Sequence, residues 1–161
     1  MMAGNFGADE NQVFTREGLY YPYYRGFVRG YNYNSFDFTM ECKDPTCAVY
    51  TRLYGTHAAM ASAELRLPLF GTEDLGLINF PYLPVELVGF ADAGMAWNGT
   101  DRPLDMLKFE RDSIERIPVF GVGPAVRLNV LGYMVFEIYY AYPFQRPDKG
   151  GHFGFNILPG W

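Results

Sequence analysis

Two carboxylates in this sequence could do chemistry, because the pattern around them brings them close together. Glu64 and Asp92 each fall among the small or polar residues of a segment that alternates with period two, and the two segments are consecutive. Close carboxylates can act as a general acid and base, or they repel each other until a cation neutralises them. A guanidinium bridges two carboxylates with bidentate hydrogen bonds. We favour this ion pair over a catalytic pair.

The cation that best fits this position is Arg29. It lies between Gly26 and Gly30, in the aromatic and glycine-punctuated stretch 19–31. By itself this stretch is typical of an adhesive surface loop or of a loop that stacks on RNA. The net charge of −5 argues against a nucleic-acid partner. The sequence therefore predicts that Arg29 pairs with Glu64 and Asp92.

Cys42 and Cys47 lie in a short, turn-rich segment. They predict a local disulfide if the protein resides outside the cytosol, with free thiols as the alternative. A metal site is less consistent with the sequence, since two thiols supply half of a tetrahedral shell. His57 and His152 lie far apart with no partner pattern. We expect no catalytic residue, no metal and no cofactor, and therefore no enzyme.

Five segments must position these groups. In each, one parity is apolar and the other is small or polar, which is the pattern of a strand with two different faces. The segments span 61–69, 85–97, 119–130, 133–144 and 152–161. Their small or polar faces carry isolated charges at Glu64, Arg66, Glu86, Asp92, Arg127 and Glu137.

The last segment closes on an aromatic residue. Phe153, Phe155, Ile157 and Trp161 share one parity, which Pro159 interrupts. This is typical of the last strand of an outer-membrane β-barrel, and the alternative is the edge strand of a soluble sandwich.

The lengths of these segments favour a membrane protein. They run about nine to thirteen residues, which suits a tilted strand crossing a bilayer and is long for a globular strand. Aromatic residues would anchor the strands at the interfaces, namely Tyr139, Tyr140, Tyr142, Phe144 and Trp161. We therefore predict an all-β fold, an antiparallel transmembrane β-barrel. No apolar run is long enough for a transmembrane helix.

The motifs resemble those of the surface-antigen superfamily, the BamA/TamA-like outer-membrane assembly factors and their two-partner secretion relatives. The resemblance rests on Val28-Arg29-Gly30-Tyr31, Ala63-Glu64-Leu65, Phe90-Ala91-Asp92-Ala93-Gly94 and the terminal aromatic strand, in this order. It covers roughly residues 19–161. It implies that the arginine loop folds into the lumen, that Arg29 docks on Asp92 and Glu64, and that Phe90 packs nearby.

The resemblance also implies a barrel of about sixteen strands. Residues 1–58 would form a long extracellular loop that folds into the lumen, and residues 59–161 would supply the last five strands. Five strands cannot close a transmembrane barrel, so missing N-terminal strands or other copies must complete it. Met1 to Tyr20 lacks the pattern of a signal peptide, which fits either a cytosolic protein or the tail of a longer one.

The expected function is assembly, insertion or translocation of proteins at the bacterial outer membrane, where the barrel would be integral. The expected partners are outer-membrane lipid and client β-barrel or secreted proteins. One alternative is a barrel that serves as a membrane anchor or passive pore for a missing upstream domain. Another is a soluble β-barrel that binds an apolar ligand.

Overall fold

The computed structural model describes residues 2–4, 17–18, 28–32, 35–42, 45–55, 57–71, 76–80, 83–99, 107–111, 113, 115–130 and 133–159. Two predictions fall outside these ranges, namely the contribution of Trp161 to the last strand and the aromatic stretch 19–27. No helix in the described ranges is long and apolar enough to cross a membrane.

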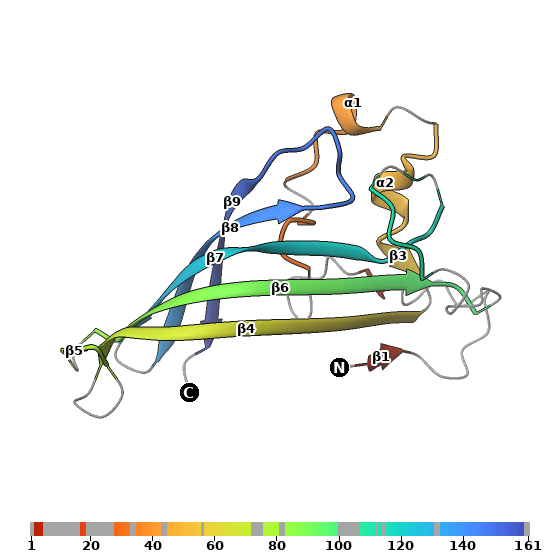
Figure 1. Cartoon of the computed structure of the whole chain (residues 1–161). Coiled ribbons are helices and arrows are strands. Elements are labelled where there is room, and N and C mark those ends of the chain that lie inside the picture. The colour runs from red at the N-terminus through yellow and green to blue at the C-terminus, as the bar shows by residue number, and fades with distance from the viewer. Residues whose placement is uncertain are drawn as a thin grey trace.

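Strands dominate the described structure (Figure 1). They are β1 (Met2–Gly4), β2 (Glu17–Gly18), β3 (Tyr54–Gly55), β4 (His57–Gly71), β5 (Ile78–Asn79), β6 (Val85–Trp97), β7 (Val119–Val130), β8 (Met134–Pro143) and β9 (His152–Pro159). Two single-turn helices, α1 (Phe38–Glu41) and α2 (Ala48–Thr51), lie in the part that the sequence predicts as loop. The five segments predicted as strands appear as β4, β6, β7, β8 and β9.

One sheet carries the fold, with the order β1-β4-β6-β7-β8-β9. All neighbours along this path are antiparallel, and β5 adds one parallel pairing on β4. The sheet curls into a half-barrel in which β9 stands away from β4 (Figure 1). The predicted all-β class and barrel-like antiparallel sheet are confirmed, and the parallel pairing of β5 is a local exception.

The two faces of the sheet differ as the alternation predicts. One cross-strand row on the outer face is exposed and apolar throughout, and it consists of Leu67, Leu87, Val126, Ile138 and Phe155. On the inner face, Val88, Phe90, Ala125, Tyr139 and Ala141 form a buried cluster. The outer face therefore presents apolar side chains to its surroundings, whereas the inner face packs inside the curl.

The prediction that Tyr139 is an interfacial anchor is wrong. Its side chain is buried on the inner face, and its hydroxyl accepts a hydrogen bond from Asn32 Nδ2 at 2.7 Å. The reason is parity, because Tyr139 alternates with the outward-facing Tyr140 and Ile138. Its ring packs edge-on against Phe90, so it belongs to the inner core.

Candidate functional site

The site begins with a tight turn that presents Arg29 to the inner wall. The amide of Tyr31 donates to the carbonyl of Val28 at 3.1 Å, and Gly30 has a φ of 102°. A positive φ at the third residue is what a type II turn requires, and glycine adopts it without strain. The turn therefore needs Gly30, and it leaves the preceding arginine free to point away from its own loop.

Arg29 lies on the inner face, where its guanidinium contacts three strands. Its Nε donates to Asp92 Oδ2 at 2.7 Å, and one terminal nitrogen donates to Asp92 Oδ1 at 2.9 Å and to Glu64 Oε1 at 3.0 Å. The other terminal nitrogen lies 3.5 Å from Glu137 Oε2. The structure thus brings together the predicted Arg29, Asp92 and Glu64 and adds Glu137 from β8.

A second arginine connects the same carboxylates. Arg127 donates to both oxygens of Glu64, at 2.9 and 2.7 Å, and to Glu137 Oε2 at 2.6 Å. Glu64 also accepts from Arg66, so three arginines share this one carboxylate. We call the six residues Arg29, Glu64, Arg66, Asp92, Arg127 and Glu137 the wall cluster. It holds three positive and three negative side chains.

Burial makes this balance of charge important. Arg29, Asp92 and Glu137 are all buried. A buried charge without a partner costs several kcal/mol. Burial by itself would lower the pKa of Arg29, but the hydrogen bond to Asp92 and the three nearby carboxylates raise it above its ordinary value. The guanidinium therefore remains charged, and the cluster is a fixed ion-pair network.

Residues of β6 and β7 pack closely against the turn that carries Arg29. The centre of the Arg29 guanidinium lies 3.7 Å from the centroid of the Phe90 ring, a cation–π contact. A Cβ on Gly121 of β7 would overlap the carbonyl oxygen of Arg29. Val28 is buried in a core with Ala96 and Val119, while Gly94 pairs with Val119. Close approach of the turn therefore depends on a glycine in the wall.

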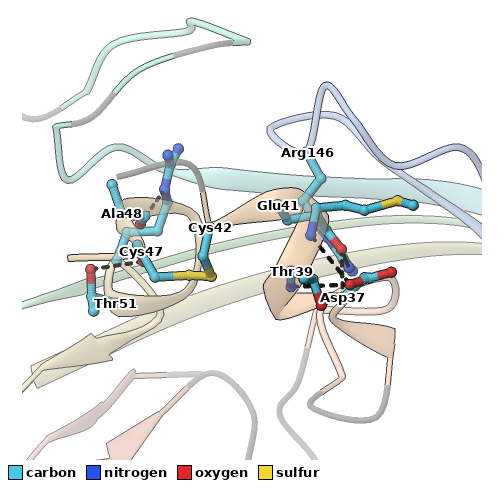
Figure 2. Close-up of a disulfide and its surroundings, with 10 residues drawn as sticks. Asp37, Thr39, Glu41, Cys42, Cys47, Ala48, Thr51 and Arg146 are labelled. Atoms are coloured by element: carbon cyan, nitrogen blue, oxygen red, sulfur yellow. Dashed lines mark hydrogen bonds and ion pairs between the residues drawn. A yellow bond between two sulfur atoms is a disulfide. The ribbon is translucent and has the colours of Figure 1, made fainter. Parts of the chain in front are cut away.

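A second arginine-centred contact, which we call the clip, fixes the next part of the loop. Arg146, between β8 and β9, donates from Nε to Glu41 Oε2 and from a terminal nitrogen to Glu41 Oε1, each at 2.7 Å (Figure 2). It also donates to the carbonyl of Gly30 at 2.6 Å and to that of Ser35 at 2.8 Å. Its side chain is fully buried and lies over the Phe36 ring. The clip thus ties the loop after β8 to the turn that carries Arg29.

Tyr31 adds a third tie between the same two loops. Its hydroxyl accepts from the amide of Gln145 at 3.0 Å and lies 3.1 Å from Gln145 Oε1. Burial raises the pKa of Tyr31 well above its ordinary value, so the hydroxyl keeps its proton. Gln145 Oε1 in turn accepts from the amide of Phe120, which connects the loop to β7.

Local structure around the clip explains how Glu41 is presented. Asp37 caps α1 by accepting from the amides of Thr39 and Met40, and these bonds lower the pKa of Asp37. Burial would raise the pKa of Glu41, but hydrogen bonds from Arg146 and from the amide of Asp37 lower it below its ordinary value. Glu41 is therefore ionised at neutral pH.

A disulfide follows directly after this helix. Cys42 and Cys47 are bonded to each other, and Cys47 leads into α2 (Figure 2). Among the described residues, no group of three or more His, Cys, Asp and Glu side chains is arranged to hold a metal ion. Phe153, Phe155 and Ile157 of the predicted terminal signal lie exposed on the outer face of β9.

Several important residues have no role in the sequence prediction. Glu137 and Arg127 carry a partial signal, since they fall on the inner parity and pair directly across β7 and β8. Glu41, Gln145 and Arg146 carry none, because they lie in irregular segments where no periodicity assigns a direction.

Comparison with known proteins adds one finding. The family model described as the Omp85 superfamily domain matches residues 11–160. No curated protein and no solved structure matches the chain.

Proposed function

Because this chain belongs to the Omp85 superfamily, we propose that it is part of an integral outer-membrane β-barrel that assembles, inserts or translocates other proteins. The superfamily consists of outer-membrane β-barrel proteins and is associated with protein assembly and translocation at that membrane. The exposed apolar row on the outer face supports the placement in lipid, since such barrels carry an outward apolar band. The role is one of binding and transport, not of catalysis.

The observation that carries the proposal is the wall cluster. Arg29 comes from a loop, yet it binds carboxylates on β4, β6 and β8 at once. A contact of this kind fixes the spacing of the strands as well as the position of the loop. We assign it the role of a latch that holds the wall in the state competent for handling clients.

Clients would act at an open strand edge. Among the described strands, β9 ends the sheet order and pairs with β8 alone. An edge in lipid leaves amide and carbonyl groups unpaired, each at a cost of several kcal/mol. Other strands of the same protein, or other copies of it, complete the barrel, and a client strand pairs at the seam by β-augmentation.

The test is insertion of a client in a purified system. The full-length protein is reconstituted into vesicles, and the folding rate of a urea-unfolded eight-stranded barrel protein is measured in its presence. The proposal expects acceleration by the wild type, loss of it in Arg29→Ala, and retention in Arg66→Ala, whose side chain lies at the exposed rim of the cluster. Ion conductance without any acceleration would refute it in favour of a passive pore, and absence of both would favour an anchor.

A further inference from the structure

The segment Leu107–Arg111, between β6 and β7, packs on the outside of the sheet. Phe109 stacks on Phe144 with ring centroids 4.6 Å apart and meets Phe120 edge-on at 5.2 Å. Phe120 alternates with the buried Val119 and Gly121, so it faces outward. The amide of Phe144 donates to the carbonyl of Phe120 at 2.9 Å, which keeps the two rings together.

These contacts leave a large apolar surface open. Phe109 is 66% exposed even though it contacts two rings, and Leu107 is 62% exposed. The surface continues along β7 into Val122 and Val126, which are also exposed. The segment therefore extends the apolar outer face instead of covering it.

The distance from this surface to the other end of β7 is close to the thickness of the apolar band of a membrane barrel. From Leu128 to Phe120, β7 advances eight residues, or about 27 Å along the strand, and roughly 20 Å along the membrane normal at the usual tilt. The apolar band of such barrels is about 25 Å tall and is bordered by aromatic residues. The three phenylalanine rings thus lie where the hydrocarbon region ends.

A cation sits beside the rings. Arg111 donates to the hydroxyl of Tyr142 at 2.8 Å, and this contact is exposed. Lys108 of the same segment is instead paired with Glu115, which lies outside the segment, at 2.6 Å. Glu110 is the one acid within residues 107–111, and it is exposed. Arg111 can therefore present its guanidinium to an anion, and guanidinium groups match phosphate geometry.

Building on the proposed membrane barrel, we infer that Leu107–Arg111 is a lipid-binding site at one membrane interface. Phe109 and Leu107 lie among the upper parts of the acyl chains. Arg111, held by Tyr142, binds the phosphate of one lipid headgroup. The apolar continuity with the outer wall selects a membrane lipid over a soluble anion as the occupant.

The first experiment measures the depth of Phe109 in the bilayer. Phe109→Trp is made in the full-length protein, in a background in which Trp97→Phe and Trp161→Phe remove the two tryptophans of this sequence. The protein is then reconstituted in phosphatidylcholine vesicles whose acyl chains carry bromine at either a shallow or a deep carbon. Ile138→Trp, on the outer face of β8, is the deep control, and Phe38→Trp, on α1, is the control outside lipid. Fluorescence is compared with the background protein.

We expect shallow bromines to quench Phe109→Trp at least about twofold more than deep ones, as for interfacial aromatic residues. Ile138→Trp should show the reverse order, and Phe38→Trp should not be quenched. Quenching of Ile138→Trp but not of Phe109→Trp would overturn the lipid site while leaving the membrane barrel intact. If neither is quenched, both the lipid site and the membrane barrel are wrong.

The second experiment tests the phosphate contact. Short-chain phosphatidic acid is titrated into the Phe109→Trp protein in a nonionic detergent, and the emission is followed. Arg111→Gln should weaken binding about tenfold, the effect of losing one charge-assisted contact, whereas Lys108→Gln should not. Equal weakening by both substitutions, or a matching response to inorganic phosphate alone, would overturn the assignment of Arg111 to a lipid.

Discussion

At the scale of single residues, Arg29 combines two kinds of contact with Asp92. Its guanidinium and its backbone amide both donate to that carboxylate, the amide at 3.2 Å. The guanidinium therefore binds the carboxylate on the inner face of the sheet, and the backbone amide fixes the orientation of the turn relative to that face. Removal of the side chain would leave three carboxylates facing Arg127 and Arg66, so the cluster would carry excess negative charge in a buried place.

Arg29→Ala should destabilise the protein by about 3–5 kcal/mol, because it leaves buried carboxylates without their partner. Arg29→Lys should recover only part of this, since a lysine cannot donate to Asp92 and Glu64 in the fork geometry of a guanidinium. The measurement is urea unfolding of the full-length protein reconstituted in lipid vesicles.

Arg66→Ala provides the matched control for Arg29. It removes another arginine that binds Glu64, but its side chain is 41% exposed. Exposed ion pairs contribute about 0–1 kcal/mol, so this variant should remain close to wild type. Equal losses for the two variants would show that the position of the charge in the lumen has no special importance.

The clip predicts a dependence on pH. The pKa of Glu41 is lower in the folded protein than its ordinary value of about 4.3. A lowered folded pKa means that the stabilisation is fully present above the ordinary value and is lost as the pH falls through the folded value. Wild type should thus exceed Glu41→Gln in stability by about 3 kcal/mol at pH 7, and the gap should narrow as the pH falls below about 4.3 and through the lower folded pKa.

The control for this pH series is Glu115→Gln. Glu115 also pairs with a cation, Lys108, but both side chains are exposed. Its stability curve should follow the wild-type curve at all pH values. A gap between wild type and Glu41→Gln that persists unchanged at pH 3 would mean that ionisation of Glu41 does not hold the clip.

At the scale of elements, alternation along the strands could be read from the sequence, but neighbour relations could be read only in part. Glu64 and Asp92 lie on strands that are consecutive in the prediction and paired in the structure, so parity is enough to place them together. Glu137 lies two strands from Asp92, and its approach to Arg29 depends on the curl of the sheet and on Arg127 between them. Period two contains no information about curvature.

The irregular segments have no periodicity from which the direction of a side chain could be predicted. Arg146 and Glu41 are 105 residues apart, and each lies in a turn or a single helical turn. Their contact depends on the three-dimensional positions of two segments that are far apart in the sequence, which no local pattern specifies. The turn is easier to predict, because Gly30 directly after Arg29 is a local signal for a positive φ.

The close contact between Gly121 of β7 and the turn that carries Arg29 predicts that a methyl group added at Gly121 displaces this turn. Gly121→Ala places a Cβ against the carbonyl oxygen of Arg29, so the turn must move away and the guanidinium must lose contacts with Asp92. The loop should then become accessible to added protease at least about tenfold faster. Limited proteolysis of the reconstituted full-length protein, followed by mass spectrometry, measures this.

Gly89→Ala is the matched control on the neighbouring strand. A Cβ at Gly89 would meet no atom within 4 Å. The same protease assay should therefore not distinguish it from wild type. If Gly121→Ala also behaves like wild type, the loop tolerates displacement and its close approach is not required.

At the scale of the whole molecule, the two faces of the sheet suit different surroundings, because one is charged and the other is apolar. The inner face gathers charges that neutralise one another, whereas the outer face holds a continuous row of exposed apolar side chains. In water such a row favours association. In lipid it is the stable arrangement, since the hydrocarbon solvates it and the charges remain enclosed.

Introducing a charge at the middle of the outer row would distinguish a protein surrounded by lipid from one surrounded by water. Val126 lies at the centre of the row, with Leu87 and Ile138 as its cross-strand partners. Val126→Arg should cost about 2–4 kcal/mol in vesicles, the cost of an arginine near the bilayer midplane. Met40→Arg, at an exposed position of α1, should cost almost nothing. Urea unfolding in vesicles gives both values. A soluble barrel would show the opposite, because Val126→Arg would then leave stability unchanged and reduce aggregation without detergent.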